Sequence, residues 1–317
     1  MDRLSRIVIG VDFTDFSRVA LEQAKRLARW SQSDLDVLHV IDKQVAGDLQ
    51  KSVGDTMSQV EQGLRETAQE RIQALFTGDP LERRRQPLKS RPPDQQERRV
   101  YDERRISMKA QVLVGDPFAE VLRQVSKTKA DLLVLGSNGT SDPQRGVGEL
   151  AIRCVRKAPC RVLIVRKAHA DPFKGVVACA KFSSVTDPVI AQSIRVARQD
   201  HAKLHIVHVY WPPWNTLHYK SPTSSSSPNY QKQYKDSLYA KLKKYIATYQ
   251  DEITDLDVSY KLIEGMRPTE SIINYIEESG AELVVVGRGR RGVQDFLLGT
   301  QGERIIHHCP VAVLVVT

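Results

Sequence analysis

Cysteine, aromatic residues and long apolar runs are all scarce in this 317-residue sequence. The four cysteines, Cys154, Cys160, Cys179 and Cys309, lack the short paired spacing of a zinc site. A chain of this length buries enough apolar surface to fold without disulfides, so we expect small buried thiols in a reducing compartment. No segment approaches the roughly 18 to 20 consecutive apolar residues of a membrane span. The first residues also lack a long apolar stretch, so we expect a cytoplasmic protein.

Catalytic motifs are missing as well. The sequence contains no G-x-S-x-G nucleophile elbow, no H-E-x-x-H zinc motif and no Walker A phosphate loop. Asp12, Asp15 and Ser17 stand close together, but capping of the first helix by Asp15 or Ser17 explains them with fewer assumptions. The adjacent His307 and His308 point in different directions on a helix, which is poor chelate geometry. We expect no metal site and no catalytic residues, and leave open only a weak ATP hydrolysis.

Positive charge is plentiful, with 47 lysines and arginines against 38 aspartates and glutamates, and an isoelectric point near 9.3. Much of the excess lies in an arginine-rich segment from Leu81 to Arg105. Carboxylates, prolines and glutamines interrupt its arginines, and Tyr101 is its only aromatic residue. This composition is typical of a solvated insert, whereas faces that bind single-stranded nucleic acid interleave basic and aromatic side chains. Nucleic acid is therefore not an expected partner.

The sequence contains an internal repeat. Residues 6–41 align with residues 174–210, and residues 130–165 align without a gap with residues 281–316. The equivalent pairs include Asp12 and Lys181, His39 and His208, Gly136 and Gly287, Gly148 and Gly299, and Pro159 and Pro310. Because the two histidines occupy equivalent places in apolar strands, we expect packed, hydrogen-bonded side chains and not ligands. Two homologous halves follow from this alignment.

The repeat also sets the expected domain limits. We place the first domain at residues 1–167, a linker at 168–173 and the second domain at 174–317. The first half is longer in its middle, which makes the arginine-rich stretch at about 78–106 an insertion. A serine-rich segment, Ser221 to Tyr230, is expected to be a loop in the second half.

Each half shows strands alternating with helices. The expected strands are 6–11, 35–41, 108–114, 131–136 and 161–166 in the first half, and 174–180, 203–210, 256–263, 282–287 and 311–316 in the second. This alternation predicts parallel sheets with helices on both faces. Ligands of such folds gather outside the carboxyl ends of the strands, where the strand order switches.

Several motifs occur in order along the chain. They are "VDFTDFS" after the first strand, "LHV" in the second, "VGDPFAEVLRQVSKTKADLLVLGSNG", and a closing "GT…ER…CPVAVLVV". Together they resemble the universal stress protein family, here in tandem, over nearly the whole chain apart from the insert and the serine-rich segment. The resemblance implies doubly wound α/β domains, each a five-stranded parallel sheet of order 3-2-1-4-5, which dimerise through the last strand. In one subfamily it implies ATP held by a Gly-x2-Gly-x9-Gly-(Ser/Thr) loop, with an early aspartate near the nucleoside.

The first half departs from this ATP pattern. Gly136 and Gly139 keep their spacing, but only eight residues separate Gly139 from Gly148, and Glu149 stands where the family has serine or threonine. Two like charges about 4 Å apart repel by about 1 kcal/mol in water and by several times more in a partly buried site. Glu149 therefore disfavours a triphosphate in the first half, although Asp12 stands where the family's aspartate would be.

The second half departs differently. Gly289 and Gly299 keep the nine-residue spacing and Thr300 supplies the hydroxyl, but the leading glycine, Gly287, lies one residue too close. Lys181 replaces the family's aspartate. The candidate nucleotide-binding residues are therefore Gly287, Gly289, Arg290, Gly299, Thr300 and Lys181 in the second half and, with weaker support, Asp12, Gly136, Gly139 and Gly148 in the first.

Three arginines, Arg288, Arg290 and Arg291, add positive charge to the second glycine loop. Backbone amides of such a loop and the positive end of a helix beginning near Thr300 can bind phosphate. The alternative that stays open is purely structural. In that interpretation the glycines let the chain turn tightly from strand to helix, and the arginines are solvated.

The last strand of each half, "CRVLIV" and "VAVLVV", is a continuous apolar run. An exposed edge strand of this kind invites pairing with another chain. If the two strands pair with each other, one polypeptide forms an intramolecular pseudo-dimer, and further pairing into a homodimer stays open.

Two functions remain open at this point. In the first, the protein acts in a stress response by binding a phosphorylated ligand, such as ATP or another adenine nucleotide, mainly at the second glycine loop, and signals to an unknown protein partner. In the second, both sites are degenerate and the protein is a ligand-free adaptor in the stress response.

Overall fold

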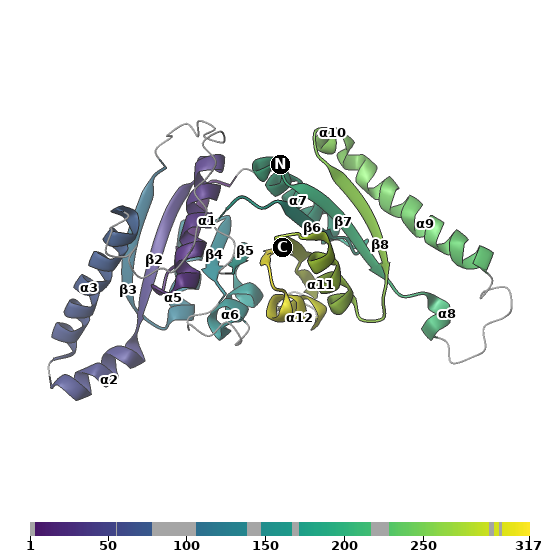
Figure 1. The fold of residues 1–317 in the computed structure, drawn as a ribbon. Helices are drawn as coiled ribbons and strands as arrows, with labels where there is room; N and C mark the ends of the chain where they lie inside the picture. Colours follow the sequence, from purple (N-terminus) through teal and green to yellow (C-terminus); the bar gives the residue numbers. More distant parts are fainter. Residues whose placement is uncertain are drawn as a thin grey trace.

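The computed structural model describes residues 4–54, 56–77, 106–137, 147–166, 171–216, 228–291, 295–297 and 300–317. The arginine-rich insert lies almost wholly outside the described residues, as do Gly139 and Gly299. Figure 1 shows two α/β domains side by side, with the first in purple to teal and the second in green to yellow. Within the described part of the chain, no helix has the length and apolar character of a membrane span.

The first half alternates strands and helices as expected. In chain order it contains β1 (Arg6–Gly10), α1 (Asp15–Ser31), β2 (Asp34–Asp42), α2 (Lys43–Val53), α3 (Met57–Thr77), β3 (Met108–Gly115), α5 (Pro117–Thr128), β4 (Leu132–Gly136), α6 (Glu149–Lys157) and β5 (Arg161–Val165). Its strands lie in the order β3-β2-β1-β4-β5, and all their pairings are parallel. The order 3-2-1-4-5 is thereby confirmed for this half.

The second half repeats the arrangement. Its elements are β6 (Gly175–Cys179), α7 (Thr186–Asp200), β7 (Lys203–Tyr210), α8 (Pro213–Thr216), α9 (Pro228–Ile246), the 3-10 turn η3 (Ala247–Tyr249), α10 (Gln250–Ile253), β8 (Val258–Glu264), α11 (Pro268–Ser279), β9 (Leu283–Gly287), β10 (Gly289–Arg291), β11 (Asp295–Leu297), α12 (Thr300–His308) and β12 (Ala312–Val316). The order β8-β7-β6-β9-β12 mirrors the first half. Because α9 begins at Pro228, the end of the serine-rich segment is helical and not a loop.

The central strands are buried on both faces, which explains their continuous apolar sequences. Every residue of β6 and of β12 is buried. On one face the sheet packs against α1, α3, α7 and α9, and on the other against α5, α6, α11 and α12. All four cysteines are buried in these layers without disulfides, as expected. Burial raises the pKa of the Cys154 thiol to about 12, so it behaves as a small apolar side chain.

The two domains share one sheet. Strands β5 and β12 pair antiparallel, with Leu163 opposite Leu314 at the centre, and the sheet runs without interruption from β3 to β8. Each strand covers the apolar edge that the other would expose to water. The expected intramolecular pseudo-dimer is therefore present.

Two arginines reinforce this junction by crossing from one domain to the other. Arg288 follows β9, is 1% exposed, and donates hydrogen bonds to the carbonyls of Val155 and of Ala158 (2.6 Å for Ala158) at the C-terminus of α6. In the other direction, Arg166 donates to the carbonyl of Ile306 near the end of α12 at 2.9 Å. Cations at helix C-termini satisfy the last carbonyls and the negative end of the helix dipole.

Ion pairs join the domains at two further places. Arg156 on α6 contacts Glu303 on α12, with 2.8 Å between Nε and Oε1. Arg26 on α1 pairs with Asp200 at the end of α7, where burial raises the pKa of the carboxyl and the Arg26 charge opposes that shift. Helices on both faces of the sheet are therefore tied across the junction.

The Arg288 contact generates a stability prediction. We expect Arg288→Ala to lower the free energy of unfolding by about 2–4 kcal/mol, because two buried carbonyls lose charged donors. Urea denaturation of the full chain measures this change. Arg123→Ala is the control, since Arg123 is largely exposed and pairs with Glu120 one helical turn away, and it should have little effect. Equal losses in both variants would contradict the role given to Arg288.

Candidate functional site

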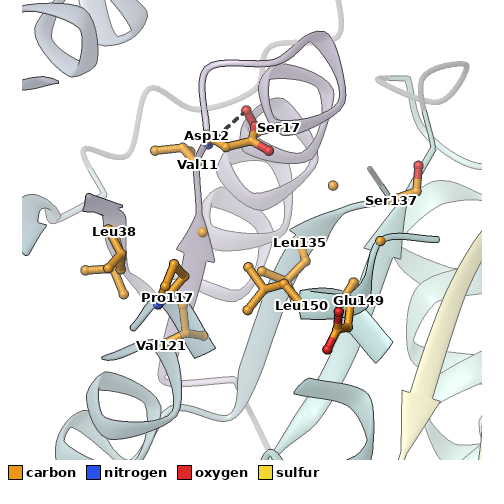
Figure 2. Close-up of a pocket in the computed structure, with 15 residues that line it drawn as sticks. Val11, Asp12, Ser17, Leu38, Pro117, Val121, Leu135, Ser137, Glu149 and Leu150 are labelled. Atoms are coloured by element: carbon orange, nitrogen blue, oxygen red, sulfur yellow. Dashed lines mark hydrogen bonds between the residues drawn. The ribbon is translucent and has the colours of Figure 1, made fainter. Parts of the chain in front are cut away.

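Each domain contains a cavity at the carboxyl ends of its strands, where the strand order switches. The first pocket has a volume of about 340 Å³ and lies at the ends of β1, β2 and β4, beneath the starts of α5 and α6 (Figure 2). The second pocket has a volume of about 300 Å³ and lies at the ends of β6, β7 and β9. Ligands of open α/β sheets bind at this place, so both pockets are candidate sites.

The first pocket combines apolar walls with two carboxylates. It is lined by Gly10, Val11, Asp12, Ser17, Leu38, Val40, Pro117, Val121, Leu135, Gly136, Ser137, Gly148, Glu149, Leu150 and Ala151. The structure therefore brings together Asp12, Gly136 and Gly148 among the residues expected from the sequence. Among the described lining residues there is no lysine or arginine, so the pocket is acidic.

The second pocket has the same plan with the opposite charge. It is lined by Cys179, Ala180, Lys181, Val207, His208, Val209, Pro268, Thr269, Ile272, Val286, Gly287, Gly302 and Ile305. Lys181 and Gly287 thus line the same cavity. No carboxylate occurs among the described residues that line it. The replacement of Asp12 by Lys181 changes the sign of an otherwise matching pocket.

The turn from β1 to α1 positions Asp12. Its Oδ1 accepts hydrogen bonds from the backbone nitrogen of Thr14 (3.0 Å) and from the Thr14 hydroxyl (2.6 Å), while its own backbone nitrogen donates to Ser17 Oγ at 3.3 Å. The N-cap of α1 is Thr14, so the expectation of Asp15 or Ser17 is corrected. Thr14 takes this role because Phe13 adopts a left-handed conformation, with φ of 63°, and the helix begins directly after Thr14.

The same turn recurs in the second half. Phe182 also has a positive φ, 53°, and the backbone nitrogen of Lys181 donates to the hydroxyl of Thr186 at 3.2 Å. A positive φ is costly for a bulky side chain and persists only when the surroundings impose it. The two turns are therefore held by specific contacts of the phenylalanine rings.

A stack of three side chains supplies these contacts in the first half. Because a carbonyl oxygen only accepts, His39 donates through Nδ1 to the carbonyl of Val11 at 2.7 Å. The His39 ring lies against Phe13 with 4.5 Å between ring centroids. Arg71 of α3 covers that phenylalanine, its guanidinium carbon 4.3 Å from the ring centroid.

The second half contains an equivalent stack. His208 donates to the carbonyl of Ala180 at 2.8 Å, and its ring centroid lies 4.3 Å from that of Phe182. Lys241 of α9 places its Nζ 4.7 Å from the Phe182 ring centroid. His39 and His208 are therefore packed, hydrogen-bonded histidines, as expected. The sequence interpretation missed the aromatic and cationic partners, although the repeat places both phenylalanines at equivalent positions.

The first glycine of each loop is needed for packing. A Cβ on Gly136 would lie 2.9 Å from backbone atoms of Phe16 and Ser17, and one on Gly287 would lie 2.6 Å from the Cβ of Val185. The end of the fourth strand of each half therefore approaches the start of the first helix too closely for any side chain. These contacts support the structural interpretation of the two glycines without excluding a ligand beside them.

The second glycine loop differs from the expected open cradle. Gly289 lies in β10, which pairs antiparallel with β11 to form a short hairpin, and β11 lies against α6 of the first domain. Arg288 is turned away to α6, so the expectation that it adds charge to a phosphate site is corrected. Thr300 begins α12, whereas the side chains of Arg290, Arg291 and Thr300 lie outside the described atoms.

Comparison with known proteins agrees with this architecture. The model of the universal stress protein family matches residues 4–166 and again residues 172–317. This chain belongs to the universal stress protein family. A universal stress protein of Mycobacterium tuberculosis is 27% identical over 222 residues, which cover 68% of this chain and 71% of that protein.

Solved structures show the same fold. A universal stress protein from Archaeoglobus fulgidus aligns over 98% of both chains with a TM-score of 0.63 and 19% identity. A functionally unknown protein from Pseudomonas aeruginosa covers 99% of this chain and 92% of its own, with a TM-score of 0.61 and 16% identity. A universal stress protein solved in complex with cAMP matches 46% of this chain at 20% identity with a TM-score of 0.34, and that ligand is a property of that protein.

The two stacks generate a prediction of pH dependence. Burial lowers the pKa of His39 and of His208 below the ordinary value of 6.5. As the pH falls below about 6.5, the unfolded chain therefore binds more protons than the folded chain. The stabilising contribution of the two neutral histidines is present above that pH and is lost below it. We expect the free energy of unfolding to fall between pH 7.5 and 5.5, by well under the limit of about 1.4 kcal/mol per histidine and pH unit, because both rings are only partly buried and water screens their charge.

Urea denaturation at several pH values measures this dependence. The double variant His39→Asn, His208→Asn keeps a side-chain donor at each position but removes the titrating ring. Its stability should vary less over the same range. The same slope in the variant and in the unaltered chain would show that other groups cause the dependence.

Proposed function

We propose that this universal stress protein binds a phosphorylated small molecule, with an adenine nucleotide as the first ligand to test, and that it does so in the second pocket. The observation that carries the proposal is Lys181, a cation at a position where the otherwise matching first pocket has a carboxylate. A lysine ammonium without a carboxylate beside it in the described lining favours an anionic ligand.

Backbone groups add to this charge. Pro268 and Thr269 open α11, Gly302 lies in the first turn of α12, and all three line the second pocket. The positive dipole ends of two helices therefore lie at one cavity that a lysine also lines. Gly287, Gly289, Arg290, Gly299 and Thr300 belong to the same proposed phosphate side of the site.

The remainder of the second pocket suits the rest of a nucleotide. Apolar side chains of strands and helices, among them Val207, Val286 and Ile305, line the cavity. The flat apolar base of a nucleotide binds to such walls because the contact removes its surface from water. In the first domain, Asp12, Gly136, Gly139 and Gly148 form the weaker candidate for the same class of ligand, because Glu149 adds a second negative charge there.

A second candidate function is supported by the second glycine loop itself. Arg288 and the β10–β11 hairpin contact α6 of the other domain. A loop used in this way joins domains and needs no ligand. In this alternative the protein is an adaptor that presents the fused two-domain surface to a protein partner in the cytoplasm.

Calorimetric titration of ATP with magnesium into the full chain distinguishes the two. We expect saturable binding that Lys181→Ala weakens about tenfold, because a charge-assisted contact to phosphate is lost. Lys203→Ala is the control and should leave this binding unchanged, since Lys203 begins β7 at the end opposite the pocket and pairs with Asp257. Asp12→Ala tests the equivalent position of the first pocket. Absence of binding heat and of thermal stabilisation would reject the nucleotide proposal and favour the adaptor. Loss of binding in Asp12→Ala alone would place the site in the first domain.

A further inference from the structure

The helix that follows the first strand of each domain carries an arginine at an equivalent position of the repeat. These residues are Arg26 of α1 and Arg195 of α7. Each donates through Nε to a glutamine about one helical turn earlier, at 3.0 Å for Gln23 and 2.9 Å for Gln192. The two guanidinium groups therefore occupy matching places, and their surroundings can be compared directly.

The charge of Arg26 is compensated by contacts with the second domain. Its guanidinium pairs with the Asp200 carboxylate at the end of α7, and the guanidinium carbon lies 5.3 Å from the Phe173 ring centroid. The backbone nitrogen of Phe173 also donates to Asp200 Oδ2 at 2.8 Å. A cation, a carboxylate, a backbone N–H group and an aromatic ring thus form one unit across the junction.

Arg195 has neither the carboxylate nor the aromatic ring. Ser31 stands at the position equivalent to Asp200, and Leu4 at the position equivalent to Phe173. Arg195 is nevertheless only 5% exposed, and its Nη1 is buried without a hydrogen-bond partner in the described part of the chain. Burial of a charge without a partner is strongly unfavourable. A negative group is therefore missing at this place, although the equivalent place contains one.

Neighbouring charges do not replace the missing carboxylate. Arg161 at the start of β5 adds positive charge, and only Asp131, directly before β4, opposes it among the charges that act on Arg195. Asp131 Oδ2 already accepts hydrogen bonds from the backbone nitrogens of Ser5 (2.7 Å) and Arg6 (3.0 Å). Burial, and then the charge of Arg161, lower the pKa of Arg195 to about 10. The guanidinium therefore keeps its charge at neutral pH.

We propose that a small inorganic anion of about the size of chloride binds to Arg195 and takes the place of the missing carboxylate. Nη1 of Arg195 is one donor, and the backbone nitrogen of Leu4, equivalent to that of Phe173, is the second. Guanidinium and backbone N–H groups both bind anions well. The anion joins the end of α1 to α7, just as Asp200 joins the end of α7 to α1.

This anion site is separate from the two pockets. Arg161 and Asp131 stand at the amino ends of β5 and β4, whereas the first pocket lies at the carboxyl ends of its strands. None of the residues of the anion site lines either pocket. Figure 1 shows α1 and α7 on the two sides of the domain junction. The bound anion therefore strengthens the junction, and this proposal does not depend on nucleotide binding.

Thermal melting of the full chain at constant ionic strength tests the anion site, with potassium gluconate replaced stepwise by potassium chloride. We expect Tm to rise by about 2–4 °C once chloride exceeds its Kd about tenfold, because the anion binds only the folded chain. Arg195→Met should remove this rise. Arg26→Met is the matched control and should keep it, since Arg26 has its own carboxylate. Chloride NMR line broadening measures the binding directly and should be lost in Arg195→Met alone.

Ser31→Asp supplies the missing carboxylate and gives a second test. We expect this variant to melt at a higher temperature than the unaltered chain in gluconate and to gain nothing from chloride, because its own carboxylate occupies the site. Three results would overturn the proposal. They are a chloride-independent Tm in the unaltered chain, the same rise in Arg195→Met as in the unaltered chain, and a folded Ser31→Asp variant that still gains the full rise.

Discussion

The antiparallel pairing of β5 with β12 is the contact on which the rest of this structure depends. Each of these strands is a short apolar run that would be an exposed sheet edge in an isolated domain. Their pairing joins two parallel sheets into one and brings α6 and α12 together at the junction, where Arg156 meets Glu303. Each of these helices begins at a pocket and ends at the other domain, so the pockets and the junction are parts of one framework.

The arginines at the junction show that contacts with the other domain determine what a residue of the glycine loop does. Arg288 stands next to Gly287, a residue of the second pocket, yet its guanidinium satisfies the last carbonyls of α6. Burial lowers the pKa of that guanidinium, and the carbonyl contacts compensate part of the desolvation. One residue of the glycine loop is thereby removed from any role in ligand binding, and the nine-residue helix α6 connects that loop to the first pocket.

Much of the fold could be predicted from the sequence because its signals are local and repeated. Runs of β-branched residues located the central strands, and the apolar last strands together with the family resemblance predicted the pseudo-dimer. The N-cap could not be predicted, because Thr14, Asp15 and Ser17 are all good caps and the choice follows from the positive φ of Phe13. The contact between Arg288 and α6 could not be predicted either, because it depends on how far one domain lies from a helix of the other, and residue spacing in the sequence does not give that distance. The contacts of Arg71 and Lys241 with the phenylalanine rings are long-range for the same reason.

Because the two domains belong to one chain, their pockets can differ from each other, whereas the two pockets of a homodimer cannot. In a homodimer every substitution appears in both sites, so the two must keep the same charge. Here the β1–α1 turn and the β6–α7 turn keep the same backbone, with a left-handed phenylalanine beneath a histidine, while the preceding residue is Asp12 in one and Lys181 in the other. The same stack occurs beside a carboxylate in one half and beside an ammonium in the other, so this geometry does not require one sign of charge at that position. The pseudo-dimer therefore preserves the geometry of a symmetric pair and at the same time permits two chemically different sites.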